Sequence, residues 1–119
     1  MKKILVIEDE PITREIICAY VEILGYSVLT LDSGLHVRAT IEAEHPVACF
    51  LDLVMDTKDG METLMEVRKL PKKPVIIAMS SNQTYLPIAK ALGADATLLK
   101  PFSPEMMQAE LQKFKISAE

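Results

Sequence analysis

Short apolar runs alternate with amphipathic stretches along the whole chain, and this alternation constrains the fold more than any other feature of the sequence. Runs such as residues 4–7 carry no polar side chain, which is typical of strands buried on both faces of a sheet. We expect five strands, at residues 4–7, 27–31, 47–51, 75–79 and 96–99. Apolar positions at helical spacing predict helices after them, at residues 11–24, 35–44, 61–70, 84–92 and 104–115. Because parallel strands need crossover connections, strict alternation predicts an α/β fold with a doubly wound parallel sheet and helices on both faces.

The length of the chain, 119 residues, suits one domain, which we expect to span residues 1–119 and to need no disulfide or metal for its core. The formal net charge of −4 argues against a large nucleic-acid interface, which needs a clustered basic face. No apolar run approaches the roughly 18 residues of a membrane span, and the first run is too short for a secretory signal. Cys18 and Cys49 lack the spacing of metal ligands, so we expect two buried, reduced thiols in a cytoplasmic protein.

Acidic, hydroxyl and basic side chains stand at the carboxyl ends of four expected strands. Glu8 and Asp9 follow the first strand, Asp52 the third, Ser80 the fourth and Lys100 the fifth. In a doubly wound sheet these ends meet at one edge, where function collects. Three carboxylates repel one another unless a cation lies nearby, and hard oxygen ligands suit Mg²⁺. A carboxylate beside a divalent ion and a lysine can accept a phosphoryl group, since positioning and charge neutralisation dominate that chemistry.

Each of these residues has a simpler explanation when it is taken alone. The acid pair before Pro11 suits the start of a helix, Asp52 and Ser80 suit turns, and Lys100 suits a surface charge. Their joint occurrence at strand ends, in one alternating pattern, favours a common site over these separate explanations.

Four segments of the chain contain the strand ends described above. They read ILVIEDEP at 4–11, CFLDLVMDTKDG at 49–60, VIIAMSS at 75–81 and LGADATLLKPF at 92–102. In this order and spacing, they resemble the receiver domain of two-component response regulators, and the resemblance covers essentially the whole chain. It implies a flavodoxin-like (βα)5 fold, a five-stranded parallel sheet with strand order 2-1-3-4-5.

The resemblance implies that Asp52 is the phosphoacceptor and that Mg²⁺ is the only cofactor. Asp9 is expected to bind the ion directly, Glu8 through water, and Asp52 as a further metal ligand. The backbone carbonyl of Val54, two residues past the acceptor, matches another protein ligand of the ion.

Two further residues match the family's phosphoryl contacts. The Ser80 hydroxyl is expected to bond the phosphoryl group, and Lys100 to contact a phosphoryl oxygen. The Lys100–Pro101 peptide matches the family's usual cis bond, which is uncommon for X–Pro bonds in general.

The implied function is a signalling switch rather than an enzyme, since such a domain catalyses only its own phosphorylation and dephosphorylation. A phosphohistidine on a histidine kinase or phosphotransfer protein donates to Asp52, and the added charge draws Ser80 and Lys100 inward. The surface formed by residues 84–92, 96–99 and 104–115 is then expected to act on an output protein or domain, or to form a homodimer. We expect this domain itself to bind neither nucleic acid nor membrane.

Three departures from the family pattern carry predictions of their own. Thr97 stands where the family has an aromatic residue whose ring moves when the domain is switched. We therefore expect the signal of phosphorylation to reach the output surface in a muted or different way. Met55-Asp56 replaces Met-Pro, which indicates either loop variation or an extra carboxylate near the ion. Val54 and Asn82 occupy the positions that tune phosphate loss. Because valine offers no hydrogen bond to an attacking water, we predict slow self-dephosphorylation.

Other functions fit the sequence less well. An aspartyl phosphatase needs two aspartates separated by one residue after the first strand, whereas this chain has adjacent Glu8 and Asp9. A flavin-binding domain needs a hydroxyl- and glycine-rich loop there, and these acids would repel its phosphate. A phosphorylation-independent interaction scaffold with a receiver fold stays open because of Thr97. A stand-alone receiver and a piece of a longer regulator both fit.

Overall fold

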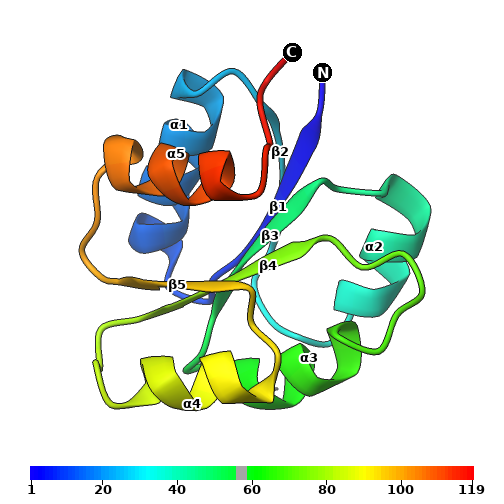
Figure 1. Cartoon of the computed structure of the whole chain (residues 1–119), viewed down its shortest axis with the longest axis vertical. Helices are drawn as coiled ribbons and strands as arrows, with labels where there is room; N and C mark the ends of the chain where they lie inside the picture. The colour runs from blue at the N-terminus through cyan, green and yellow to red at the C-terminus, as the bar shows by residue number, and fades with distance from the viewer. Residues whose placement is uncertain (56–58) are drawn as a thin grey trace.

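Strands and helices alternate throughout the computed structural model, which describes residues 1–55 and 59–119 (Figure 1). The elements are β1 (Lys3–Ile7), α1 (Pro11–Ile23), β2 (Ser27–Leu31), α2 (Val37–Glu44), β3 (Ala48–Asp52), α3 (Gly60–Val67), β4 (Val75–Ser80), α4 (Tyr85–Leu92), β5 (Ala96–Leu99) and α5 (Pro104–Lys113). The strands form one parallel sheet in the order β2-β1-β3-β4-β5. This confirms the fold class and the strand order expected from the sequence.

Successive side chains of each strand point to opposite faces of the sheet and enter two separate cores. In β3, Phe50 packs in the core with α1 and α5, whereas Cys49 and Leu51 pack in the core with α2, α3 and α4. Figure 1 shows the same division, with α1 and α5 on one side of the sheet and the other helices opposite. Burial on both faces explains why the strands read as continuous apolar runs.

Several element ends differ from the expected ones. Asp52 and Ser80 are the last residues of β3 and β4 rather than the residues after them, since each still pairs with a neighbouring strand. The expected ends of α3 and α5, at residues 70 and 115, are too late. Pro71 disfavours a helical residue before it, and Lys115 has a φ of 58°, which leaves the helical path. None of the helices in the described ranges is both long and apolar enough to cross a membrane.

The two cysteines are free, as the sequence predicts. Cys49 is fully buried in β3, and burial raises the pKa of its thiol to about 12. Cys18 on α1 is only half-buried, less than expected, because it lies at the edge of the core between α1 and the sheet. Burial also raises the pKa of the Cys18 thiol.

Candidate functional site

The ends of β1 and β3 lie side by side at the point where the strand order reverses. The chain passes from β1 to β2 on one side, and β3 lies on the other side of β1, which is the arrangement that opens a crevice in doubly wound sheets. Ile7 pairs with Leu51 across these strands, so Glu8 and Asp52, the next residues, end up together. The fold therefore brings two of the predicted acids to the same edge.

Three of the predicted site residues form an acid cluster at this edge: Glu8, Asp9 and Asp52. One carboxylate oxygen from each lies within 4.8 Å of the other two. Glu8 and Asp52 are buried, whereas Asp9 is half-buried. This donor set fits Mg²⁺, which uses few carboxylates and keeps several waters, because the half-buried Asp9 leaves one side of the cluster open to solvent.

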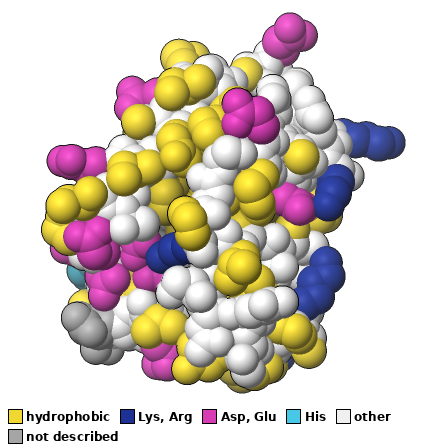
Figure 2. Space-filling view, turned by 90° about the vertical axis from the view of Figure 1, so that its left-hand side faces the viewer, with side chains coloured by type: hydrophobic (Ala, Val, Ile, Leu, Met, Phe, Trp, Pro, Cys, Tyr) yellow, Lys and Arg dark blue, Asp and Glu magenta, His cyan; other side chains and the backbone are white. Residues whose placement is uncertain are grey.

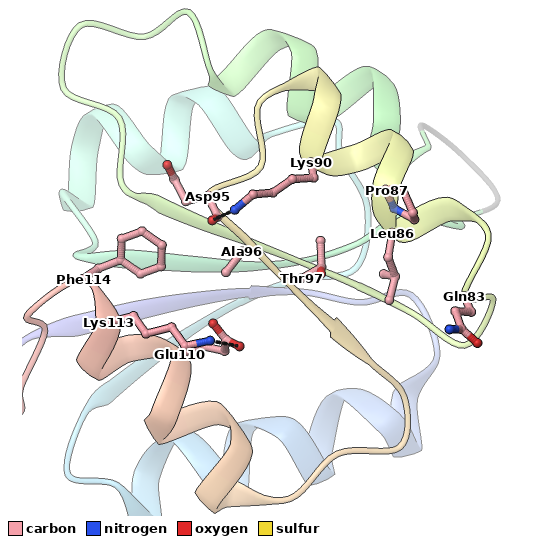
Figure 3. Close-up of a pocket in the computed structure, with 10 residues that line it drawn as sticks. All are labelled: Gln83, Leu86, Pro87, Lys90, Asp95, Ala96, Thr97, Glu110, Lys113 and Phe114. Atoms are coloured by element: carbon pink, nitrogen blue, oxygen red, sulfur yellow. Dashed lines mark hydrogen bonds and ion pairs between the residues drawn. The ribbon is translucent and has the colours of Figure 1, made fainter.

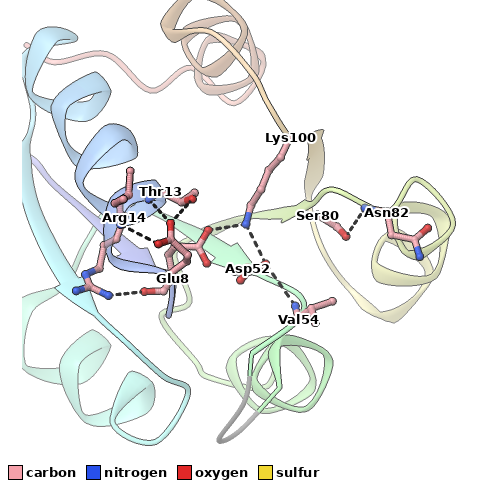
Figure 4. A network of polar contacts seen from close by, with 10 residues as sticks. Glu8, Thr13, Arg14, Asp52, Val54, Ser80, Asn82 and Lys100 are labelled. Atoms are coloured by element: carbon pink, nitrogen blue, oxygen red, sulfur yellow. Dashed lines mark hydrogen bonds and ion pairs between the residues drawn. The ribbon is translucent and has the colours of Figure 1, made fainter.

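The Lys100 ammonium lies between two of these carboxylates (Figure 4). Its Nζ atom is 2.5 Å from Glu8 Oε1 and 3.2 Å from Asp52 Oδ1. The lysine side chain is 18% exposed, and those of Glu8 and Asp52 are 1% and 6% exposed. Both ion pairs are therefore largely shielded from water. In such a buried position, a charge without a partner is costly.

Glu8 holds its proton more tightly than an ordinary glutamate. Burial raises the pKa of the Glu8 carboxyl from 4.5 to about 7, and the hydrogen bond and the charge of Asp52 act in the same direction. The Lys100 ammonium opposes this rise. The Glu8 carboxylate forms an ion pair with Lys100 in the structure.

Ser80 ends β4, and Lys100 directly follows the neighbouring strand β5. The backbone N–H of Lys100 donates to the Ser80 carbonyl at 2.9 Å, which ties the end of β4 to the end of β5. Ser80 is 2% exposed, and its hydroxyl oxygen accepts from the backbone N–H of Asn82 at 3.0 Å. The predicted cis peptide between Lys100 and Pro101 is present.

The backbone that follows Asp52 is closely packed against the start of α3. Asp52 Oδ1 accepts from the Val54 N–H at 3.4 Å, and the Gly60 N–H donates to the Leu53 carbonyl at 3.1 Å. A Cβ atom at Gly60 would lie only 2.0 Å from the Asp52 carbonyl oxygen and 2.4 Å from the Leu53 Cα. Gly60 therefore sets how closely α3 approaches the acceptor strand. The remaining predicted loop residue, Asp56, lies outside the described residues.

Two residues near the acid cluster have roles that the sequence analysis missed. The Arg14 guanidinium donates to the Glu8 carbonyl at 2.9 Å, which ties α1 to the end of β1. The Glu10 carboxylate accepts from the backbone N–H groups of Ile12 and Thr13, so it is Glu10 that caps α1. The N-cap residue of α1 is thus Glu10 rather than Glu8 or Asp9.

The model of the response regulator receiver domain family matches residues 4–112 of this chain. The chain belongs to this family. Membership of this family explains why acidic, hydroxyl and lysine side chains meet at one edge of the sheet, as the alternating pattern predicts.

Curated relatives of the receiver are longer proteins. The probable transcriptional regulator ycf27 of Porphyridium aerugineum is 35% identical over 112 residues, which cover 93% of this chain and 47% of that protein. The probable C4-dicarboxylate response regulator DctR of Bacillus subtilis (strain 168) is 32% identical over 117 residues, which cover 95% of this chain and 52% of that protein. The receiver thus spans about half the length of these relatives.

Among solved structures, the receiver domain of the sensor histidine kinase PA1611 from Pseudomonas aeruginosa PAO1 is similar to this one. The two chains are 28% identical with a TM-score of 0.86, and the match covers 94% of this chain and 95% of that one. That domain was crystallised with a magnesium ion coordinated in its active-site cleft.

Thr97 lies in β5 between α4 and α5 (Figure 3). It is half-buried and lines a groove of about 530 Å³ together with Leu86, Pro87 and Phe114. Figure 2 shows apolar and charged side chains mixed on the side of the molecule that faces left in Figure 1. The groove therefore lies between α4 and α5, on the surface that the sequence analysis expects to carry the output.

Proposed function

We propose that this receiver takes a phosphoryl group onto Asp52 from the phosphohistidine of a histidine kinase or phosphotransfer protein. The supporting observation is the position of Asp52, buried within the acid cluster and 3.2 Å from the Lys100 ammonium. One Asp52 carboxylate oxygen attacks phosphorus while the P–N bond of the donor breaks. The electron pair of that bond stays on the imidazole nitrogen, and a neutral ring leaves when its other nitrogen carries a proton.

We assign the metal site to the acid cluster and the following loop. Asp9, Asp52 and the Val54 carbonyl would hold Mg²⁺ directly, and Glu8 would do so through water. Bound there, the ion would neutralise charge on the phosphoryl oxygens, which is the main catalytic requirement of phosphoryl transfer.

Ser80 and Lys100 would contact the new phosphoryl group. The Ser80 oxygen accepts from Asn82, and a hydroxyl that accepts a hydrogen bond can still donate its own proton. The Lys100 ammonium already lies at the acceptor carboxylate, so a short movement would pair it with a phosphoryl oxygen. Because the Lys100 N–H is bonded to the Ser80 carbonyl, movement of one residue would be passed to the other.

The output of the proposed switch is a change at the surface formed by α4, β5 and α5. That surface would contact an output protein or domain, or a second copy of the receiver, and the groove at Thr97 would make its relay differ from one based on an aromatic ring. The receiver would thus be a signalling phosphoacceptor that catalyses only its own modification. Two free cysteines support a reducing compartment such as the cytoplasm.

The exposed face of α1 is our proposed docking site for the phosphodonor. Ile12, Ile16 and Ile23 recur at helical spacing and are 68%, 47% and 71% exposed. Next to them lies a pocket of about 340 Å³, which Ile16 and Lys100 both line. An apolar helix face that continues into the acceptor site fits a helical donor, whose phosphohistidine would then face Asp52.

The direct test is phosphorylation by acetyl phosphate and Mg²⁺, followed by intact mass. Wild-type protein should gain one phosphoryl group, whereas Asp52→Asn and chelator-treated wild type should gain none. A phosphorylated Asp52→Asn protein would refute the assignment of the acceptor.

The alternative is a phosphorylation-independent interaction scaffold, which the departure at Thr97 favours. A scaffold would gain no phosphoryl group from acetyl phosphate or from phosphohistidine donors and would bind its partner equally well with Asp52→Asn. Partner binding that strengthens on phosphorylation of the wild type would exclude it.

A further inference from the structure

An apolar pocket of about 340 Å³ opens beside the acceptor site. Its volume lies at the small end of the range typical of ligand pockets, which are mostly apolar and carry a few polar groups. The pocket therefore suits a small molecule rather than a segment of a peptide. The residues that line it include Ile16, Ile17 and Tyr20 of α1 together with Ser81, Lys100 and Phe102.

The walls of this pocket are held by the core between α1 and the sheet. Ile17 and Phe102 are 3% and 8% exposed and belong to that core. The rings of Tyr20 and Phe102 meet edge to face, with their centroids 6.5 Å apart and their planes at 63°. This is one of the favoured geometries of an aromatic pair. A ligand would therefore meet a preformed apolar surface, and little binding energy would be lost to reorganisation of the protein.

One end of the pocket reaches the acceptor. Lys100 lines the pocket, and its Nζ atom is 3.2 Å from Asp52 Oδ1. Ser81, which also lines the pocket, directly follows Ser80, the proposed phosphoryl contact. A ligand whose apolar part fills the pocket would thus hold its polar group near Asp52. The Lys100 ammonium favours a negatively charged group at that position.

A second apolar groove near the acceptor is less suited to an anionic ligand. It has a volume of about 460 Å³, and the residues that line it include Val54, Asp59 and Ile88. Asp59 brings a carboxylate to this groove, and none of the described residues that line it is basic. Because like charges repel, an anion is favoured in the pocket at Lys100 over this second groove.

We propose that the pocket between α1 and Phe102 binds the acyl group of an acyl phosphate, so that acyl phosphates with longer apolar chains phosphorylate the receiver faster than acetyl phosphate. This deepens the proposed function, on which it rests, by naming a class of small-molecule phosphodonor. One Asp52 carboxylate oxygen attacks phosphorus while the bond between phosphorus and the acyl oxygen breaks. The electron pair of that bond stays on the acyl oxygen, and a carboxylate anion leaves without taking up a proton.

The first test compares butyryl phosphate with acetyl phosphate, both far below saturation and in the presence of Mg²⁺. Butyryl phosphate carries two more methylene groups, and their burial in the pocket should make its second-order rate constant about tenfold higher. Intact mass follows the phosphorylated protein. Equal rate constants for the two donors would overturn the proposal.

Matched variants separate the two apolar grooves. Ile16 and Ile88 are 47% and 46% exposed, so glutamine replaces either one with little effect on the core. Ile16→Gln should reduce the preference for butyryl phosphate to about threefold or less, because a polar side chain then lines the pocket. Ile88→Gln, which alters the groove at Val54, should keep the wild-type preference. A preference that persists in Ile16→Gln, or is lost in Ile88→Gln, contradicts the assignment of the pocket.

The second test needs no phosphoryl transfer. Analogues of the two donors in which a methylene replaces the bridging oxygen keep the phosphoryl group, and NMR of the backbone amides follows their binding to the wild-type receiver. The butyryl analogue should bind about tenfold more tightly than the acetyl analogue and shift the signals of Ile16, Tyr20 and Phe102 more than that of Ile88. Equal affinities, or a larger shift at Ile88, would refute the proposal. A receiver that binds the longer analogue in this pocket but is phosphorylated by neither donor would refute the proposed function alone.

Discussion

Replacing Gly60 with alanine should destabilise the receiver through a clash with the acceptor strand. The added Cβ would lie 2.0 Å from the Asp52 carbonyl oxygen and 2.4 Å from the Leu53 Cα. Both are backbone atoms, so neither can rotate away as a side chain would. Overpacking costs about 1–3 kcal/mol where side chains can adjust, and we expect about 3 kcal/mol here. For a domain of this size, that lowers the melting temperature by roughly 12 °C.

The assay is thermal and urea unfolding followed by circular dichroism. The matched control is Asp59→Ala, because Asp59 caps the same helix by accepting from the Glu62 N–H at 2.9 Å. Loss of that cap should cost only about 1 kcal/mol. If Gly60→Ala melts within about 4 °C of wild type, or together with Asp59→Ala, the clash argument is wrong and α3 shifts to accommodate the methyl group. Gly60→Ala should also accept phosphate from acetyl phosphate more slowly, because the clash displaces the backbone of Asp52.

Three other predictions follow from the site and its surroundings. In metal-free buffer, the free energy of unfolding should fall as pH rises from about 4.5 to 7, by at most about 3 kcal/mol, because folded Glu8 keeps a proton that the unfolded chain releases at its lower pKa. Urea midpoints should show this fall in wild type but not in Glu8→Gln. Ile16→Asp should slow transfer from a phosphohistidine donor about tenfold and leave the acetyl phosphate rate unchanged; an equal loss with both donors would contradict docking on α1. Val54→Asn should shorten the phosphoryl lifetime measured by intact mass, whereas identical decay in the two proteins would contradict the argument that valine cannot orient water.

The parts of the site that follow from strand order were predictable from the sequence. Alternation fixes a parallel sheet, and parallel strands bring their carboxyl ends to one edge, so Glu8, Asp52, Ser80 and Lys100 were expected to meet. Each of these residues follows or ends an apolar run, and that position in the sequence is itself the signal.

Contacts between residues far apart in the sequence were not predictable in the same way. The ion pair of Lys100 with Glu8 joins residues 92 positions apart, and its geometry depends on side-chain directions that no local pattern encodes. The Arg14 contact with the Glu8 carbonyl leaves no trace in periodicity, because Arg14 reads as an ordinary polar helix residue. Gly60 gave a weak signal, since an Asp-Gly pair before an amphipathic stretch marks a helix start, but its approach to Asp52 appears only in three dimensions.

The full burial of Cys49 gives the receiver an internal probe of the strand that carries Asp52. The Cys49 thiol lies three residues before Asp52 in β3, is inaccessible to solvent, and has its pKa raised to about 12. Since thiol reagents attack the thiolate, they should modify Cys49 only in molecules whose sheet has opened, whereas half-buried Cys18 stays the more accessible of the two. The rate of Cys49 alkylation in native protein, followed by mass, would therefore measure how often the central strand opens. A slower Cys49 reaction after phosphorylation would show that a phosphorylated Asp52 at the end of this strand holds the sheet closed.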